Sequence, residues 1–471
     1  MVSRKNPTRT KRSPSNEISI NTDQLKAAIQ WIVTKGMFAH ISLHGNVGWL
    51  PQQLVTLAVL FAWSDGSRMT DCFKKGARLC QNLFNVLPIA TFQGMVRALV
   101  TYGPQLIPCL WTRFQSLMAQ VAPSHFRMGK WLPLAVDGSR FTTPRTESNE
   151  RAFGAKSYGK GRQAKSRAKW KNKKKRSKKL SAPVKPQIWL TLVWHMGLKL
   201  PWCWKTGPSN ASERDHLVEL IKSQQFAENT LFCGDAGFTG YEFWNSIIEK
   251  GHSFLVRVGG NVRLLKNLGY ARQKNGIVCL WPHAAARKKQ PPIILRLIEL
   301  KNERGSMYLV TNVLDNNELS EETLKHLYPL RWGIELHFRA VKQTYGRRNL
   351  RSRKSDHAIV ELEWSLIALT MVQLFCIREQ HKIEIHPDQA SITLALAAVR
   401  HAMDTWNEDL PKSSSLKIEL QQATKDSYKR TKPKAARYKP QIKDKPTNKG
   451  PTIVNASNKQ KRMAKLLPNP A

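Results

Sequence analysis

The chain of 471 residues lacks several features that would assign it to a class at once. It has no uninterrupted apolar run long enough to cross a bilayer, and its segment MVSRKNPTRTKRS has no apolar core of the kind found in signal peptides. Its seven cysteines are scattered and never close-spaced, which argues against a disulfide framework or a zinc ribbon. It also has no GxxxxGK[ST] loop to cradle nucleotide phosphates. These absences predict a cytoplasmic protein with no membrane span and no nucleotide cofactor.

Acidic residues are also scarce, since 33 Asp and Glu stand against 76 Lys and Arg, for a formal net charge of +43. A chain this basic predicts a polyanionic partner, and nucleic acid is the first expectation. The charge is concentrated in residues 1–17, 151–180 and 421–471. We expect a basic disordered arm, a Lys-rich insertion and a basic disordered tail, all holding phosphates without reading sequence. For the two terminal segments, the alternative is that they only keep the protein soluble.

Residues 18–125 are predicted to form a helical N-terminal domain. Stretches such as TDQLKAAIQWIVTKGMF and LPQQLVTLAVLFAW carry apolar residues at helical spacing and few strand signals. Such a domain in a basic protein would serve in DNA binding or dimerisation. A plain helical cap on the next domain is the alternative, and the sequence does not separate the two.

From residue 130 the pattern changes to that of an α/β domain. WLPLAVDGSRF and NTLFCGDAGF are predicted to be buried strands, QIWLTLVWHMGLKLPWCWKTG a hairpin, and SERDHLVELIKSQQF an amphipathic helix that Ser212 caps. The order of elements indicates a mixed sheet with flanking helices. A mainly β insertion at about 255–318 interrupts it, and helices are expected at 320–345, 355–380 and 391–406.

Two acids stand out, because Asp137 and Asp235 are each predicted to end an apolar strand and to precede a turn-forming run, DGS or DAG. Side chains at the carboxyl ends of strands collect at the ligand-binding edge of such a sheet. A buried acid requires a positive partner, which is either Arg or Lys, or a divalent cation such as Mg²⁺. Two metal ions would cleave a phosphodiester bond, and holding both usually takes a third carboxylate.

The stretch YPLRWGIELHFRAVK supplies a candidate third acid, Glu335. On one continuous helix, Tyr328, Arg331, Glu335 and Lys342 would share one face, so that the acid has cations on either side for phosphates. The alternative is a salt-bridged surface helix, since Arg331–Glu335 and Glu335–Arg339 are both i,i+4 pairs. Pro329 is expected to start or kink the helix.

The spacing Y-x2-R-x3-E-x6-K at these four residues resembles the signature of bacterial insertion-sequence transposases of the IS-four group, a DDE family with an RNase H-like catalytic domain. AVDGSRF, FCGDAGF and PRTESNERAFG are similar to that group as well. The resemblance implies an RNase H-like domain over 130–406. It also implies that Asp137, Asp235 and Glu335 bind two Mg²⁺ or Mn²⁺ ions, and that Tyr328, Arg331 and Lys342 contact DNA, to which we add Arg339.

Relatives of this group hold a flipped base with a Trp from the β insertion during hairpin formation. Here the insertion offers Trp281, but the stretch just ahead of the Glu335 helix has Met307 and Tyr308 instead. The resemblance therefore leaves the excision route open, including whether it has a hairpin step.

The leading hypothesis is a DNA transposase that cleaves double-stranded DNA at transposon ends and transfers the freed 3′-OH into target DNA. A homodimer bridging both ends is expected, in a bacterial cytoplasm and associated with the nucleoid. The alternatives are a metal-dependent nuclease without strand transfer and a non-catalytic DNA-binding protein derived from a transposase.

Overall fold

The computed structural model describes residues 20–85, 89–154, 185–269, 276–302, 305–406, 408, 414–426 and 450–467. The predicted basic arm 1–17 and nearly all of the Lys-rich insertion 151–180 lie outside the described residues, as do residues 427–449 of the predicted tail.

The α-helices are α1 (Ile20–Ile32), α2 (Pro51–Trp63), α3 (Met69–Phe84), α4 (Phe92–Val121), α5 (Glu147–Phe153), α7 (Glu213–Ser223), α8 (Tyr241–Ile248), α9 (His283–Arg287), α10 (Glu321–Leu330), α11 (Gly333–Arg339), α12 (Ser355–His381), α13 (Ile392–Asp404), α14 (Leu416–Gln422) and α15 (Asn458–Lys465). The strands are β1 (Leu132–Thr142), β2 (Gln187–His195), β3 (Leu200–Gly207), β4 (Thr230–Gly234), β5 (Ser253–Val258), β6 (Arg263–Lys266), β7 (Ile277–Leu280), β8 (Ile293–Asn302), β9 (Gly305–Thr311) and β10 (Thr452–Asn455).

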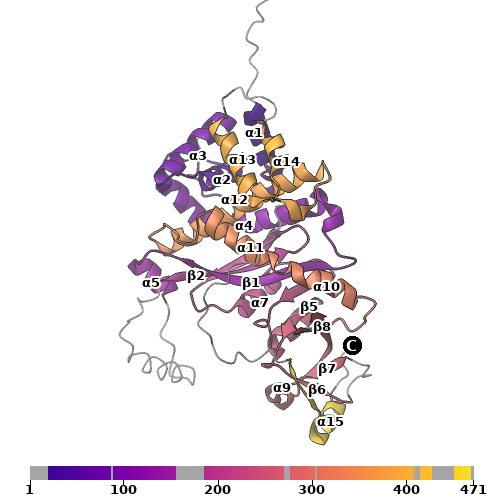
Figure 1. Cartoon of the computed structure of the whole chain (residues 1–471). Helices are drawn as coiled ribbons and strands as arrows, with labels where there is room; N and C mark the ends of the chain where they lie inside the picture. Colours follow the sequence, from indigo (N-terminus) through magenta and orange to yellow (C-terminus); the bar gives the residue numbers. More distant parts are fainter. Residues whose placement is uncertain are drawn as a thin grey trace, which may run out of the picture.

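One mixed sheet runs through the molecule in the order β10-β6-β7-β8-β9-β5-β4-β1-β2-β3. Strands β1, β2 and β3 are antiparallel, whereas β4 and β5 run parallel to β1. Helices α4, α11 and α12 cover one face of this part of the sheet and α7 the other (Figure 1). The inner strands are nearly all apolar because both faces are covered. This arrangement confirms the predicted RNase H-like α/β fold.

The β-rich insertion extends the same sheet. Strand β5, near the expected start of the insertion at about 255, belongs to the core because it pairs in parallel with β4. On its other side β5 pairs antiparallel with β9. Strand β9 pairs with β8, β8 with β7, and β7 with β6. The insertion therefore lengthens the catalytic sheet along one direction.

The prediction of a disordered tail over 421–471 is wrong for residues 450–467. These residues form β10, which pairs in parallel with β6, and α15, which buries Ala464 (1% exposed). The β-branched residues of TIVN suit a strand, and Ser457 caps the helix by accepting from the backbone N–H of Gln460. The high density of cations hid this short amphipathic pattern. Helix α14, which begins just before the predicted tail and overlaps its first two residues, was also missed.

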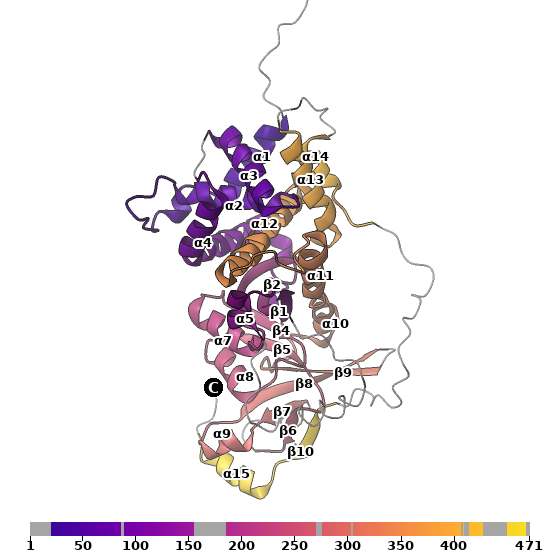
Figure 2. The same ribbon diagram turned by 90° about the vertical axis from the view of Figure 1, so that its left-hand side faces the viewer.

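The N-terminal helices share a core with helices from the other end of the chain. Helix α12 packs against α2 and α4, and α13 and α14 pack against α1 (Figures 1 and 2). The indole N–H of Trp63 donates to the carbonyl of Ala368 at 2.8 Å, and the Arg400 Nε donates to the carbonyl of Trp63 at 2.9 Å. The predicted helices are present, but they do not form a separate domain.

Helix α12 is long and apolar enough to cross a membrane by length and composition, which the sequence reading did not anticipate. However, 83% of that apolar stretch is buried inside the protein. It serves as the central helix on which the other helices pack.

An acid lies in this apolar setting. Glu363 of α12 lines a small cavity with Pro104 and Trp111 of α4. Burial raises the pKa of Glu363 to about 7, and the nearby Trp204 indole acts in the opposite direction.

The ionisation of Glu363 is expected to reduce stability. The folded chain keeps the proton up to about pH 7 whereas the unfolded chain releases it near its ordinary value of 4.5, so the free energy of unfolding falls as pH rises between the two. We therefore expect the free energy of unfolding of Glu363→Gln at pH 8 to exceed that of the wild type by about 3 kcal/mol or less, and its unfolding temperature to be higher. Both differences should shrink toward pH 5. Thermal unfolding at both pH values measures this. The control is Glu322→Gln on the exposed side of α10, and a pH-independent difference for Glu363→Gln would contradict the assignment.

Candidate active site

The sheet brings Asp137 and Asp235 to one level. Strands β1 and β4 pair in parallel, with Ala135 opposite Cys233. Two residues further along each chain are Asp137 and Asp235, which therefore lie side by side where β4 ends at Gly234. Asp235 follows its strand directly, as predicted. Asp137 does not end β1, because β1 continues to Thr142 by pairing with β2.

Backbone N–H groups of glycines hold both aspartates. The N–H of Gly138 donates to Asp137 Oδ1 at 2.8 Å, and the N–H of Gly237 donates to Asp235 Oδ1 at 2.7 Å. These bonds leave the second oxygen of each carboxylate for another partner.

Arg331 links Asp137 to Glu335. Its Nη1 lies 3.9 Å from Asp137 Oδ2, and its Nη2 lies 3.6 Å from Glu335 Oε1. The side chain of Arg331 is 12% exposed, whereas that of Glu335 is 36% exposed and borders solvent. The predicted i,i+4 pair therefore exists, but its guanidinium also reaches the strand-borne acid. Glu335 therefore forms the predicted ion pair and is also linked to Asp137 through Arg331.

The electrostatics of Asp137 reflect this crowding. The pKa of Asp137 is raised to about 6, chiefly by burial and to a lesser degree by the nearby Asp235 and Glu335, while the Gly138 N–H and Arg331 act to lower it. Like charges gathered in a half-buried site favour a proton or a cation.

The predicted single helix over 320–345 is three pieces. Helix α10 ends one residue after Pro329, α11 begins at Gly333, and residues Ala340–Thr344 form a π-helical turn. The break falls where Pro329 was expected to kink the chain. The four signature residues therefore do not share one continuous helical face.

The structure corrects the role predicted for Tyr328. Its side chain is buried, at 6% exposed, and its hydroxyl donates to the carbonyl of Gly234 at 3.0 Å. This bond ties α10 to the end of β4, immediately before Asp235. Tyr328 is therefore held inside the fold and does not lie on the protein surface, where the predicted contact with DNA would be made.

Lys342 and Arg339 lie in different surroundings. The Nζ of Lys342 donates to Ser139 Oγ at 2.6 Å, two residues beyond Asp137, so this cation lies at the edge of the site. Burial lowers the pKa of Lys342, and Arg348 adds to that effect. Arg339 is exposed and lines a different cavity, so the structure does not bring it to the carboxylates.

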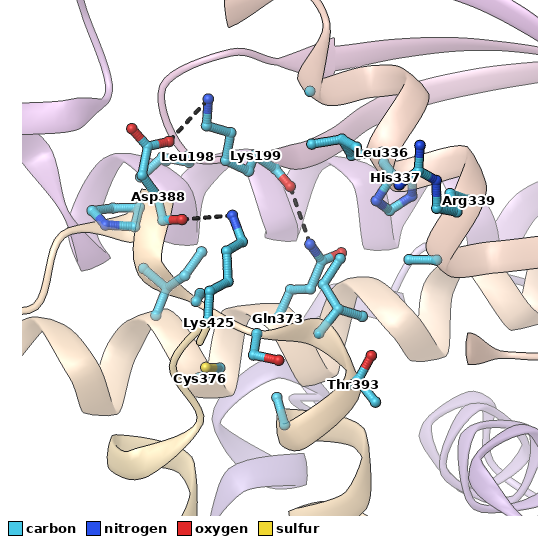
Figure 3. Close-up of a pocket in the computed structure, with 18 of the residues that line it drawn as sticks. Leu198, Lys199, Leu336, His337, Arg339, Gln373, Cys376, Asp388, Thr393 and Lys425 are labelled. Carbon is cyan, nitrogen blue, oxygen red and sulfur yellow. Dashed lines mark hydrogen bonds and ion pairs between the residues drawn. The ribbon is translucent and has the colours of Figure 1, made fainter. Parts of the chain in front are cut away.

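That cavity has about 620 Å³ and lies beside α11, bounded by α12 and α13 (Figure 3). Trp332 and Leu336 face it together with Arg339. Across it, Asp388 forms an ion pair with Lys199 at 3.0 Å and accepts from Lys425 Nζ through its backbone carbonyl at 2.6 Å. None of the three predicted catalytic acids lines this cavity, so it is separate from the carboxylate site.

A fourth acid, Glu213, belongs to the site and was missed from sequence. It is the first residue of α7, and a Cβ built on Gly138 would lie 2.4 Å from its Oε1, so its carboxylate lies directly over that glycine. Burial raises the pKa of Glu213 to about 7, and Asp137 and Asp235 raise it too. The only sequence signal was an acid in the first turn of a capped helix, which is an ordinary feature of helices.

Gly333 seats the helix that carries Glu335. A Cβ at this position would lie 2.2 Å from Cη2 of Trp194, a fully buried residue of β2. The absence of a side chain therefore lets α11 pack directly on the indole ring. This close approach fixes the height of Glu335 above the sheet.

The donor set fits a divalent cation in its chemistry, because carboxylate oxygens are the ligands that Mg²⁺ and Mn²⁺ prefer. Asp137 and Asp235 lie level, and their repulsion would be relieved by such a cation. In the described part of the chain, no three acidic, His or Cys side chains converge closely enough to hold an ion. Glu335 faces Asp137 across the guanidinium of Arg331.

Trp281, the aromatic residue that the insertion offered for a flipped base, is not available. It is 5% exposed, and its indole N–H donates to the carbonyl of Gln290 at 2.9 Å.

A sheet of this order, with two acids level on β1 and β4 and a third on a later helix, is that of RNase H-like polynucleotidyl transferases. The family described as Transposase DDE domain matches residues 132–371, more than half of the chain, and the chain belongs to that family. The chain is 25% identical over 329 residues to the transposase InsG of insertion sequence element IS4 from Escherichia coli (strain K12), with 68% of this chain and 69% of that protein covered. The predicted class, a DDE transposase, is thereby confirmed.

Among solved structures, the piggyBac transposase synaptic complex with hairpin DNA matches 88% of this chain and 87% of its own, with 11% identity and a TM-score of 0.40.

Substituting Gly333 tests how the site is positioned. The added methyl group of Gly333→Ala meets a rigid, buried ring, so we expect α11 to shift and the protein to lose about 1–3 kcal/mol of stability. Displacement of Glu335 should lower DNA cleavage roughly a hundredfold at temperatures where the variant remains folded. Gly36→Ala is the control, because nothing lies within 4 Å of a Cβ there. Wild-type cleavage by Gly333→Ala would mean that this contact does not position the acid.

Proposed function

We propose that the chain cleaves double-stranded DNA at the ends of a mobile element and joins the freed 3′-OH to target DNA, with Asp137, Asp235 and Glu335 as its catalytic acids. The observation that carries this proposal is the register of β1 and β4, which lines up two acids, together with the contact through Arg331 that brings the third. Family membership supplies the reaction class, and the geometry supports these particular residues.

The chemistry draws on divalent cations, Mg²⁺ or Mn²⁺ and two in number, which when bound activate the attacking oxygen and stabilise the leaving one. Asp137, Asp235 and Glu335 would hold them, and Glu213 stands close enough to add negative charge to the same centre. Arg331 would exchange its contact with Asp137 for a DNA phosphate once the acids are neutralised. Lys342, at the rim, is the second phosphate contact that the geometry supports.

No nucleotide cofactor is required, because each phosphodiester bond that forms replaces one that breaks. Joining two transposon ends in one reaction calls for two copies of the chain, so we propose a homodimer in the complex with DNA. We also place the protein in the bacterial cytoplasm, at the nucleoid, where its DNA lies.

Replacing one acid by its amide separates chemistry from binding. Asp235→Asn keeps the size and the hydrogen bond from Gly237 but removes the charge, so we expect cleavage and strand transfer to fall at least a thousandfold. DNA binding should be unchanged or tighter, because a repulsive charge is gone. The assay uses Mg²⁺ and DNA that carries the element's ends, with Asp71→Asn on exposed α3 as the control. Cleavage at the wild-type rate would exclude Asp235 from the catalytic set.

The same assay distinguishes the two alternatives. Joined products support the transposase, cuts without joining support a nuclease, and binding without either supports a non-catalytic protein. All three acids are present although they lie at separate places in the sequence. Their presence favours the transposase and the nuclease over the non-catalytic protein.

A further inference from the structure

The end of the sheet farthest from β1 forms a second polar cleft. A cavity of about 960 Å³ lies there between α8, the β6–β7–α9 segment and the C-terminal β10–α15 segment. Figures 1 and 2 show α9 and α15 at the end of the molecule opposite to α1–α3. We call this cavity, with the exposed face of α15, the tip cleft.

The tip cleft is lined by cations from three parts of the chain and by no acid. Arg263 comes from β6, Arg287 from α9 and Lys459 from α15. Beside the cavity, Lys288 forms an ion pair with Glu242 at 3.7 Å, and both of these side chains are mostly exposed. The cavity therefore has positive side chains and no carboxylate in its lining, which favours an anionic partner.

The C-terminal segment is what completes this surface. Strand β10 pairs with β6 from Thr452 opposite Arg263 to Asn455 opposite Lys266, and the Asn267 side chain donates to that of Asn455 at 3.1 Å. The pairing fixes the start of α15, whose buried side carries Ala464. Its outer side exposes Lys459, Arg462 and Lys465, and the segment 450–467 contains no acidic residue.

The tip cleft lies too far from the carboxylates to act on the same phosphate. Six strand intervals separate β6 from β1 in the sheet, which at about 4.8 Å each amounts to roughly 30 Å. A duplex that advances about 3.4 Å per base pair would cover that span in roughly nine base pairs. Both surfaces can therefore contact one duplex at places about one helical turn apart.

We propose that the tip cleft binds the backbone of duplex DNA about one helical turn away from the cleaved phosphate, which rests on the proposed function for the identity of the DNA. Its cations contact phosphates and release counterions, without reading bases. The occupant is a duplex because the cations are spread along an exposed helix and its neighbouring strand, and the tryptophans of the cleft, Trp244 and Trp281, are buried and cannot stack on bases.

Charge reversal on α15 tests the proposal. The variant K459E/R462E/K465E should bind a long duplex at least tenfold more weakly and reduce the slope of log Kobs against log salt by about 2–3, near 0.9 for each lost phosphate contact. The matched control is K222E/K250E/K325E, which changes the charge equally at exposed lysines of α7, the end of α8 and α10. R263Q/R287Q, inside the cleft, should reduce the slope without reversing any charge.

The test uses substitutions and no deletion of residues 450–467, because such a deletion would remove β10 and uncover the edge of β6. Thermal unfolding checks that each is folded, and K459Q/R462Q/K465Q replaces the glutamate variant if that one is not. On DNA carrying the element's ends, hydroxyl-radical protection should disappear roughly one turn from the cleavage site and persist at that site.

An unchanged salt slope in the folded α15 and R263Q/R287Q variants overturns the tip cleft, as does an equal loss in the control. That result leaves the proposed function intact if the wild type still joins DNA. A reduced slope in a protein that joins no DNA supports the tip cleft and counts against strand transfer instead. Stronger loss for a single strand than for a duplex would also overturn the proposal.

Discussion

Repulsion among carboxylates is the constraint on which the rest of this structure depends. Asp137 lies on β1 and Glu213 on α7, and the neighbouring Asp235 contributes to the raised pKa of both. A fold tolerates such a cluster only where each acid has its own support. Glycine N–H groups hold the two aspartates, and Arg331 bridges Asp137 and Glu335. For Glu213, Arg140 and Arg214 act to lower a pKa that burial and the two aspartates raise. The site is thus prepared for positive charge.

Rigid packing around the cluster holds these acids in position. The Tyr328 hydroxyl fastens α10 to the residue before Asp235, and Gly333 lets α11 lie directly on the Trp194 ring. On the other side of the sheet, Gly138 leaves the space that the Glu213 carboxylate occupies. Each of these contacts is a close approach that a larger residue would prevent. Small residues and one buried hydroxyl therefore set the geometry, while the acids supply the chemistry.

Local pattern in the sequence predicted much of the fold, including the β2–β3 hairpin, the cap at Ser212 and the acid after β4. It did not predict where β1 ends, because β1 continues only through its partner β2. It also missed β10, whose four residues pair with a strand almost 190 positions earlier, and Glu213, which resembles any first-turn acid. Tyr328 was assigned to DNA by the family resemblance, and neither that resemblance nor the spacing distinguishes a buried hydroxyl from an exposed one. Contacts between distant segments were therefore the unpredictable part.

The charge of the chain and the charge of its site have opposite signs, and this opposition orders the proposed reaction. A chain of net charge +43 would attract a polyanion such as DNA over a range set by salt, with little regard to sequence. The carboxylates repel the phosphate that must react, so a duplex held by distant cations does not settle into the site unaided. Only cations bound among Asp137, Asp235 and Glu335 would remove that repulsion and free Arg331 to face the phosphate. In the proposed reaction, binding by the surface and chemistry at the centre are therefore separate steps, and DNA held without metal would be kept from cleavage by the same acids that would hold the cations.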